Sequence, residues 1–383
     1  MADLYLFYTI FRFSYYGIFV GLHIALMAGL LLEWLRDRKA LKNTLTENSR
    51  VSLIIPVHNE SRRIRGLLQS LEAQDYPHAE IIFVDDRSLD GTADMITGFI
   101  QKTGQPARII SLRENPGPNH KQYALARGIE VSSGDFILFT DADCELPSSW
   151  IGSMVKRMSN EKTGAAIGPV LKRHEGKGFF HLYQCFEHGI RYIYLAGATG
   201  LGAAGGGFGN NLILRRACLD AVGGYENIPP SPTEDAALVS KIRSCSDYKV
   251  RAALGSDVHV ITQGESGWKD LVNQPLRWNN GGLFSPDPVT RFNYAFLMIT
   301  IAMGILAIPL LVFLPSIWPL PLGVLTSMTF NTIANLILLG TSLPRRRLAY
   351  IPMLLFTPMY FTFLTILGFW GVKTTWKGKE VKS

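Results

Sequence analysis

The most informative segment of this 383-residue chain is Phe136-Ile137-Leu138-Phe139-Thr140-Asp141-Ala142-Asp143. Its first half is a short run of large apolar residues, which is typical of a strand buried on both faces. Two carboxylates, Asp141 and Asp143, follow at the carboxyl end of that strand. Such a pair can hold one divalent cation against a nucleotide diphosphate, although an exposed acidic turn would carry the same residues. The stretch therefore predicts a buried strand that ends in a polar site.

Three similar runs precede it, over residues 51–57, 80–85 and 108–112. Stretches of helix length, with apolar residues at helical spacing, separate them. This alternation predicts an α/β domain whose mostly parallel sheet is covered by helices on both faces. Ligands bind such sheets beyond the carboxyl ends of the strands. Polar residues follow the first strand at 58–60 and the second at 85–92, so we expect the site at this edge.

The composition indicates that part of the chain lies in lipid, because 47% of its residues are hydrophobic and its mean hydropathy is +0.14. Residues 15–35 are almost uninterrupted apolar sequence and reach about 30 Å as a helix, which is the thickness of a bilayer core. Three more segments of similar character fit residues 294–314, 320–339 and 348–370. We therefore expect helices that cross or line a membrane at both ends of the chain.

Basic residues follow the first apolar segment instead of preceding it, as Arg36, Arg38 and Lys39 show. This order is that of a membrane anchor and not of a cleaved signal peptide. By the positive-inside rule, the chain enters the cytosol near residue 36. We expect four parts: an anchor over 1–36, a cytosolic catalytic domain over 37–292, membrane or interfacial helices over 293–372 and a basic tail over 373–383.

The topology contains a conflict, because three full crossings after a cytosolic domain would leave the lysine-rich tail on the outer side. One of these three apolar segments need not cross the membrane. Pro352 and Pro358 make the last apolar segment the candidate for a broken or re-entrant helix, and the sequence leaves this open.

The net charge of +7 and the four cysteines exclude some functions. Basic residues gather beside apolar segments, which favours anionic lipid headgroups over nucleic acid. The cysteines form no C-x-x-C pair and have no metal-ligand spacing, so we expect reduced thiols and no zinc site. They are Cys144, Cys185, Cys218 and Cys245.

With these polar strand ends in view, residues 50–285 resemble glycosyltransferase family 2 enzymes with the GT-A fold. No one motif is decisive, but the order of the six is specific. They are Ile55-Pro56-Val57-His58-Asn59-Glu60, Val84-Asp85-Asp86-Arg87-Ser88-Leu89-Asp90-Gly91-Thr92, Lys121 with Ala124-Leu125-Ala126-Arg127-Gly128, Asp141-Ala142-Asp143, Thr233-Glu234-Asp235, and Gln274-Pro275-Leu276-Arg277-Trp278. The resemblance implies an inverting transferase that uses a nucleotide-sugar donor.

The resemblance also assigns a donor site and a metal site. Asp143 would be the direct ligand of Mg²⁺ or Mn²⁺, with Asp141 closer to the ribose. The cation would offset the charge of the departing diphosphate. A capped turn at the second motif and a solvated helix lysine at Lys121 are the plainer interpretations. The implied donor-binding residues are Pro56, Glu60, Asp85, Asp86, Lys121, Asp141 and Arg277.

Asp235 is the candidate general base, because the Thr-Glu-Asp motif matches the acceptor-base motif of the family. The alternative is that these residues only favour a helix N-terminus. Glu234, Gln274 and Trp278 would bind the acceptor, although Trp278 could equally be an interfacial anchor.

Glycines at 200–205 match the G-x-G-x-x-G pattern but lie in the middle of the domain, so a dinucleotide site is not expected. By resemblance, the glycines at 205–209 form a flexible or close-packed loop near the acceptor.

The sequence thus predicts an inverting, metal-dependent glycosyltransferase of the inner membrane that moves a sugar, expected to be UDP-linked, to a lipid acceptor. One alternative is a processive polysaccharide synthase, with dimerisation or higher homo-oligomers supplying more membrane helices. A second is a catalytically silent nucleotide-sugar sensor or assembly partner, for which loss of Asp143 or Asp235 would be expected; both residues are present.

Overall fold

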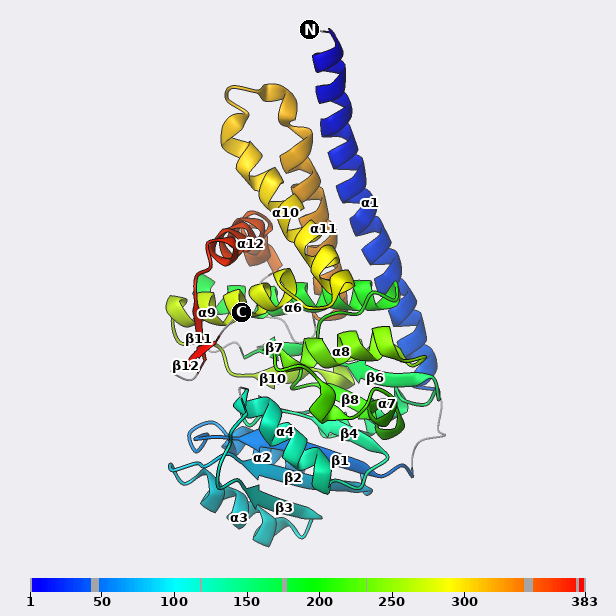
Figure 1. The fold of residues 1–383 in the computed structure, drawn as a ribbon, viewed down its shortest axis with the longest axis vertical. Coiled ribbons are helices and arrows are strands. Elements are labelled where there is room, and N and C mark those ends of the chain that lie inside the picture. Colours follow the sequence, from blue (N-terminus) through cyan, green and yellow to red (C-terminus); the bar gives the residue numbers. More distant parts are fainter. Residues whose placement is uncertain are drawn as a thin grey trace.

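The computed structural model describes residues 2–42, 48–117, 119–173, 178–231, 233–340, 347–376 and 379–381. A mixed α/β body carries a group of long helices that project from one end, as Figure 1 shows. The body is built on a seven-stranded sheet in the order β3-β2-β1-β4-β8-β6-β9. Its strands are β1 (Val51–Val57), β2 (Ala79–Asp85), β3 (Ala107–Ser111), β4 (Phe136–Phe139), β6 (Thr163–Ile167), β8 (Leu212–Arg215) and β9 (Lys249–Ala252).

The predicted parallel sheet is confirmed, because β3, β2, β1 and β4 are the four expected strands and all run parallel. Val51 is paired with Ala79 on one side and with Phe136 on the other, so β1 is central. Strand β8, which the sequence did not predict, lies antiparallel between β4 and β6. The carboxyl ends of β1, β2 and β4 therefore meet at one edge.

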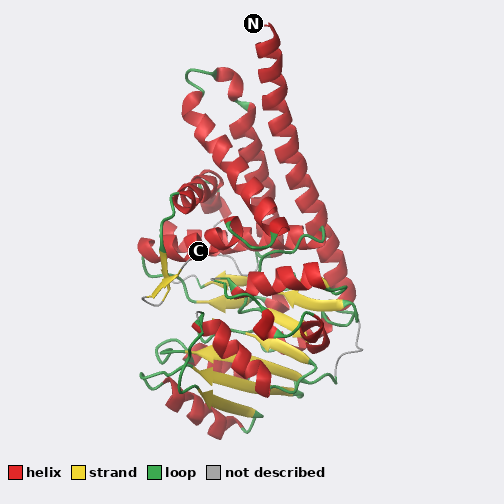
Figure 2. Cartoon of the chain, in the orientation of Figure 1, coloured by secondary structure: helices red, strands yellow, loops and turns green. Residues whose placement is uncertain are grey.

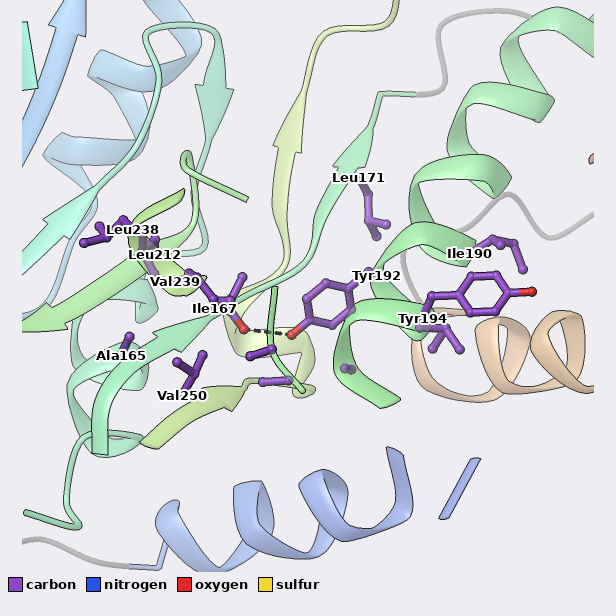
Figure 3. Packing of buried hydrophobic residues seen from close by; sticks show 14 of the residues in the cluster. Ala165, Ile167, Leu171, Ile190, Tyr192, Tyr194, Leu212, Leu238, Val239 and Val250 are labelled. Atoms are coloured by element: carbon purple, nitrogen blue, oxygen red, sulfur yellow. Dashed lines mark hydrogen bonds between the residues drawn. The ribbon is translucent and has the colours of Figure 1, made fainter. Parts of the chain in front are cut away.

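Helices cover both faces of the sheet, as Figure 2 shows. Alternate residues of β1 point to opposite faces: Leu53 and Ile55 pack with one buried cluster and Ile54 with the other. Figure 3 shows part of the second cluster, where the hydroxyl of Tyr192 donates to the carbonyl of Ile167 at 2.8 Å. The helices of the body are α2 (Arg65–Glu72), α3 (Thr92–Thr103), α4 (His120–Val131), α5 (Trp150–Lys156), α7 (Arg216–Ala221) and α8 (Glu234–Cys245).

A second, three-stranded sheet stands beside the site in the order β5-β10-β7. Its strands are β5 (Cys144–Glu145), β10 (Val260–Thr262) and β7 (Val170–Lys172). A hairpin of β11 (Thr374–Trp376) and β12 (Lys379–Val381) lies near the C-terminus. Short 3₁₀ helices are η1 (Tyr225–Asn227), η2 (Ser256–Val258), η3 (Pro315–Ile317) and η4 (Arg347–Tyr350).

Four helical segments are long and apolar enough to cross a membrane, at Tyr5–Ala40, Pro288–Leu310, Pro315–Leu338 and Leu348–Phe369. They contain α1 (Ala2–Ala40), α10 (Pro288–Leu310), α11 (Pro319–Leu338) and α12 (Met353–Phe369). Helix α1 is longer at both ends than the predicted segment 15–35, and it continues past the predicted boundary at residue 36. The division into four parts stays a prediction.

The four apolar helices do not share one direction. In Figure 1, α1, α10 and α11 run along the long axis, and the N-terminus and the α10–α11 connection lie at the end far from the sheet. Helix α12 is seen nearly end-on in the same view and so lies crosswise to them. Helices α6 (Phe179–Gly200) and α9 (Trp268–Leu283) also lie crosswise, between the long helices and the body.

Helix α1 is fixed to α6 and to the body by several contacts, of which two are the tightest. It crosses α6 at Gly29, where a Cβ would lie 2.2 Å from the carbonyl oxygen of Gly197, so only glycine allows this approach. Nearer its C-terminal end, Asp37 forms a buried ion pair with Arg157 (2.6 Å), and Arg157 also contacts Asp257 (2.8 Å). The last turns of α1 are thus part of the packing of the body.

Candidate active site

The first part of the site consists of the loops that follow β1 and β2. The amide of Asn59 donates to the hydroxyl of Ser88, and the Asn59 side-chain oxygen accepts from the amide of Leu89 at 2.8 Å. Asn59 (φ 55°) and Arg87 (φ 60°) both adopt the left-handed conformation, which is costly outside glycine and is typical of functional sites. The two loops are therefore held together in a fixed geometry.

Asp85 and Asp86 are both buried at the end of β2. The Asp86 carboxylate accepts hydrogen bonds from Arg87 Nε at 2.9 Å and from Asn115 Nδ2 at 3.0 Å. Asp85 Oδ1 accepts from the amide of Ser88. Both the predicted turn and a polar pocket wall are consistent with these bonds. A cavity of about 580 Å³ opens beside them, lined by Asn59, Glu60, Ser61, Arg62, Arg63 and Asp90.

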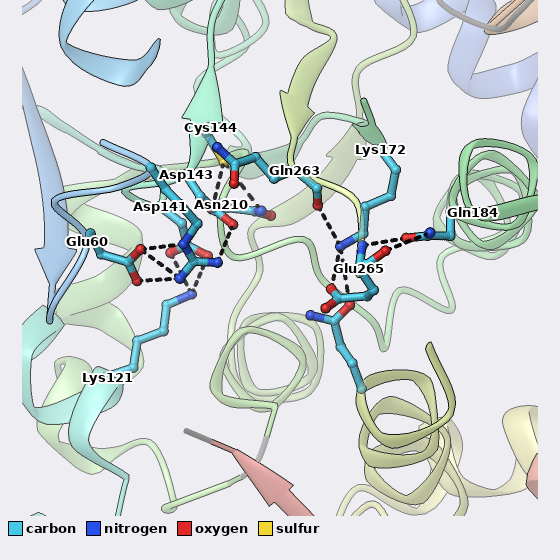
Figure 4. A network of polar contacts seen from close by, with 12 residues as sticks. Glu60, Lys121, Asp141, Asp143, Cys144, Lys172, Gln184, Asn210, Gln263 and Glu265 are labelled. Carbon is cyan, nitrogen blue, oxygen red and sulfur yellow. Dashed lines mark hydrogen bonds and ion pairs between the residues drawn. The ribbon is translucent and has the colours of Figure 1, made fainter. Parts of the chain in front are cut away.

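Lys121, on α4, contacts Asp141 in the loop after β4 and Glu234 at the start of α8. Figure 4 shows the first of these contacts. Its Nζ lies 2.7 Å from Asp141 Oδ1 and 3.6 Å from Glu234 Oε1. Burial lowers the pKa of Lys121, but the two carboxylates raise it by more, so its pKa lies above the ordinary value. Burial raises the pKa of Glu234, and Lys121 opposes that rise. Lys121 is thus a charged bridge and not the solvated helix lysine of the plainer interpretation.

Asp143 has a different cationic partner, Arg63, which the sequence did not single out. The Arg63 guanidinium donates to both carboxylate oxygens of Glu60 at 2.8 Å, and its NH1 atom lies 3.6 Å from Asp143 Oδ2. Burial and the nearby charge of Asp141 raise the pKa of Asp143, while Arg63 lowers it. Arg63 is one turn beyond Glu60, a spacing that could have drawn attention to it.

The two aspartates fit a divalent cation by their chemistry, since hard carboxylate oxygens suit Mg²⁺ and Mn²⁺. Burial raises the pKa of Asp143, and the negative charge of Asp141 raises it further. Among the described residues, no group of three or more histidine, cysteine or acidic side chains could hold a metal ion. Such a cation would complete its ligands with other oxygen atoms, for example those of a diphosphate or of water.

Asp235 lies against the glycine segment 205–209. Its carboxylate accepts from the amide of Gly209 at 2.7 Å and from that of Ala236 at 2.8 Å. A Cβ at Gly207 would lie 2.9 Å from the Asp235 Cβ, so the segment is close-packed at this point. Thr233 is the N-cap of α8 but its side chain makes no capping hydrogen bond. The Asp235 carboxylate, at the start of α8, therefore also holds the glycine segment in place.

Helix α9 brings the last motif to the same region. Lys172 Nζ donates to Gln274 Oε1 at 3.3 Å, to Glu265 Oε1 at 2.9 Å and to the carbonyl of Gln263 at 3.1 Å. Burial lowers the pKa of Arg277, and the charges of Glu234, Asp235 and Asp141 oppose that change, which places these groups around it. The sequence did not identify Lys172.

Trp278 is turned toward α6 and α12. The Arg191 guanidinium lies 5.5 Å from the centre of the Trp278 ring and 5.1 Å from that of Phe361 in α12. Arg191 is in turn paired with the fully buried Glu187. The ring of His188 meets Trp278 edge to face at 5.4 Å. The i, i+4 spacing of Glu187 and Arg191 in the sequence indicates their ion pair but not the contact with Trp278.

The comparisons with known proteins agree with the expected family domain and fold. The family model described as glycosyl transferase family 2 matches residues 52–223. A poly-β-1,6-N-acetyl-D-glucosamine synthase of Staphylococcus epidermidis is 26% identical over 241 residues, covering 61% of this chain and 54% of that protein. An undecaprenyl-phosphate 4-deoxy-4-formamido-L-arabinose transferase of Serratia proteamaculans is 35% identical over 113 residues, covering 28% and 33%. The chain spans two thirds or less of the length of the curated relatives it matches.

Among solved structures, the fold is similar to that of a mannosyltransferase, PcManGT, from Pyrobaculum calidifontis in complex with GDP-Man and Mn²⁺. The TM-score is 0.53 and the sequence identity 18%, and the match covers 94% of this chain and 99% of that one. The body therefore has a GT-A-like fold. With the family model and this fold together, residues 52–223 form a glycosyl transferase family 2 domain.

Proposed function

We propose that this glycosyltransferase is an inverting, metal-dependent enzyme that moves a sugar from a UDP-linked donor to a lipid acceptor at the membrane surface. The observation that carries the proposal is the position of Lys121 between Asp141 and Glu234. One charged side chain thereby links the carboxylates assigned to the donor with the motif assigned to the acceptor.

The donor would lie along the carboxyl ends of β1, β2 and β4. Pro56, Glu60, Asp85 and Asp86 would border the nucleoside, and Lys121 would face the diphosphate as a point charge. A cation held by Asp143 and Asp141 would act as a Lewis acid on the departing diphosphate.

The transfer itself would be one in-line displacement. An acceptor hydroxyl attacks the sugar carbon from the face opposite the diphosphate, the bond to the diphosphate breaks, and the hydroxyl proton passes to a base. Asp235 suits this role better than Glu234, because Asp235 is only half-buried whereas Glu234 is buried and engaged by Lys121. The amides of Gly209 and Ala236 would hold its carboxylate in place.

The acceptor side would lie at the membrane surface. Helices α6 and α9 lie between the body and the long apolar helices, and Gln274 and Trp278 are both on α9. We infer that α1, α10 and α11 span the bilayer and that the crosswise α12 lies at its surface. This topology would keep Lys373 on the side of the catalytic domain and would remove the conflict with the positive-inside rule.

The test is transfer by the full-length protein in lipid nanodiscs, supplied with a panel of nucleotide sugars and Mn²⁺ and with lipid acceptors that include polyprenyl phosphate and diacylglycerol. We expect a product that partitions into organic solvent with one or very few sugars, and loss of transfer in excess chelator. A long water-soluble polymer would favour a processive synthase, the activity named for the Staphylococcus relative. Full activity in chelator would exclude the metal-dependent mechanism.

A further inference from the structure

The most informative group outside the motifs is the guanidinium of Arg63, which lies between Glu60 and Asp143. Its two hydrogen bonds to Glu60, both at 2.8 Å, orient the flat group, and NH1 is left 3.6 Å from Asp143 Oδ2. A positive charge therefore already stands beside the carboxylate assigned as the direct metal ligand.

Each aspartate of the pair is contacted by one basic side chain, but the two side chains differ in solvent exposure and in distance from their aspartate. Lys121 is enclosed, with its side chain 19% exposed and Nζ in direct contact with Asp141. Arg63 is 40% exposed, lines the 580 Å³ cavity and reaches Asp143 only at a longer distance. Arg63, and not Lys121, can therefore move away from its aspartate without disturbing buried residues.

A divalent cation and the guanidinium repel each other when both contact Asp143, so each weakens the binding of the other. Free metal would therefore bind more tightly once Arg63 has moved away from Asp143. A nucleoside diphosphate changes this balance, since its phosphate oxygens complete the ligands of the cation and offer the displaced guanidinium a bidentate partner.

We propose that Arg63 is a displaceable counter-cation of the metal site, which holds Asp143 until the donor arrives and then turns toward the donor diphosphate. The inference rests on the proposed metal and donor sites. It assigns Arg63 two opposite effects: it weakens the binding of free metal and strengthens the binding of nucleotide together with metal. A salt bridge that served only to orient Glu60 in the donor pocket would also affect the binding of UDP, but it would not change the affinity for free metal.

The experiment measures Mn²⁺ binding to the full-length protein in nanodiscs by the electron paramagnetic resonance signal of free Mn²⁺, with and without UDP. Without UDP, Arg63→Gln should bind Mn²⁺ about three- to tenfold more tightly than the wild type, a modest change because Arg63 is partly exposed. With UDP and Mn²⁺ together, the same variant should bind UDP more weakly by a similar factor. Arg63→Lys keeps the charge and should retain most of the competition with free metal. Arg65→Gln is the matched control, since it removes the same charge at an exposed position two residues away and should change neither affinity.

An unchanged Mn²⁺ affinity in Arg63→Gln, in a preparation where Asp143→Asn still abolishes Mn²⁺ binding, would overturn the role of Arg63 and leave the metal site intact. Failure of the wild type to bind Mn²⁺ even with UDP would instead overturn the proposed metal site. If Arg63→Gln does not fold, Arg63→Met replaces it, since methionine keeps the stem of the side chain without the charge: tighter Mn²⁺ binding without UDP supports the proposal, and an unchanged Mn²⁺ affinity contradicts it.

Discussion

The two halves of the site are held in place in different ways. The donor half, formed by the loops after β1, β2 and β4, is fixed largely by partners inside the sequence motifs, such as Asn59 with Leu89 and Asp86 with Arg87. Arg63 contacts Asp143 from outside the motifs.

The acceptor half, formed by Asp235, Gln274 and Trp278, has its partners outside the motifs. The amide of Gly209 donates to Asp235, and Lys172 on β7 donates to Gln274 on α9. The contacts of the donor half are therefore more local in the sequence than those of the acceptor half.

The largest expected effect separates the halves at Asp235. Asp235→Asn removes the proposed base, so transfer should fall by about 10²–10⁴-fold, while UDP affinity should change little because donor contacts lie in the other half. Turnover and UDP binding by calorimetry check this. Asparagine can accept only one of the two amide hydrogen bonds, from Gly209 and Ala236, so the unfolding temperature should also fall slightly.

Asp220→Asn is the control for Asp235→Asn, because Asp220 is an exposed acid on α7. Near-normal turnover in Asp235→Asn would remove this residue as the base. Equal losses of turnover and UDP affinity would show that the halves are not separable.

A smaller effect is expected in the donor half at Asp86. Asp86→Asn weakens charge-assisted hydrogen bonds that organise the pocket wall, each worth about 1.5–3 kcal/mol. UDP affinity should fall by roughly tenfold or more, whereas turnover at saturating donor should stay within a few-fold of the wild type. Asp94→Asn, an exposed acid on α3, is the control. A loss of turnover without a loss of affinity would contradict the donor assignment.

The smallest effect on transfer concerns the scaffold that both halves share. Burial lowers the pKa of His259 to about 4 from its usual 6.5, with Asp257 raising it and Arg157 lowering it further. The folded state therefore binds fewer protons than the unfolded state, so stability is complete above pH 6.5 and is lost progressively as the pH falls toward 4. The loss should be of order 3 kcal/mol per domain.

Thermal unfolding followed by circular dichroism between pH 7.5 and 4 checks this dependence. His259→Gln should flatten it, because glutamine does not titrate. An unaltered pH dependence in that variant would assign the titration to another group.

The difference between local and long-range contacts also explains which features could be predicted from the sequence. The four parallel strands were predicted because apolar runs and polar motifs occupy neighbouring positions, and the donor residues at their ends stay a prediction. Strand β8 was missed, since a three-residue apolar run such as 212–214 does not distinguish a strand from part of a buried helix. The direction of α12 was left open because hydropathy measures the length of a segment and not its orientation.

The overlooked site residues share one property: each is a charged side chain whose importance comes from a distant partner or from burial. Lys172 and Gln274 are 102 positions apart, and nothing next to Lys172 in the sequence signals that contact. Arg191 gains its position beneath Trp278 only when α6, α9 and α12 come together. Motifs identify reacting groups better than the groups that orient them.

The double attachment of α1 also has a mechanical consequence. One helix carries both the apolar segment and Asp37, and it is fixed to the body at Gly29 and again at Arg157. Inserting a single residue between these points would rotate one attachment by about 100° relative to the other. In the proposed topology, α1 is a rigid membrane-spanning helix that fixes the distance between the active site and the lipid surface. Acceptors would then be selected partly by how far their reactive hydroxyl stands out from the membrane, and the enzyme would meet them by diffusion in two dimensions.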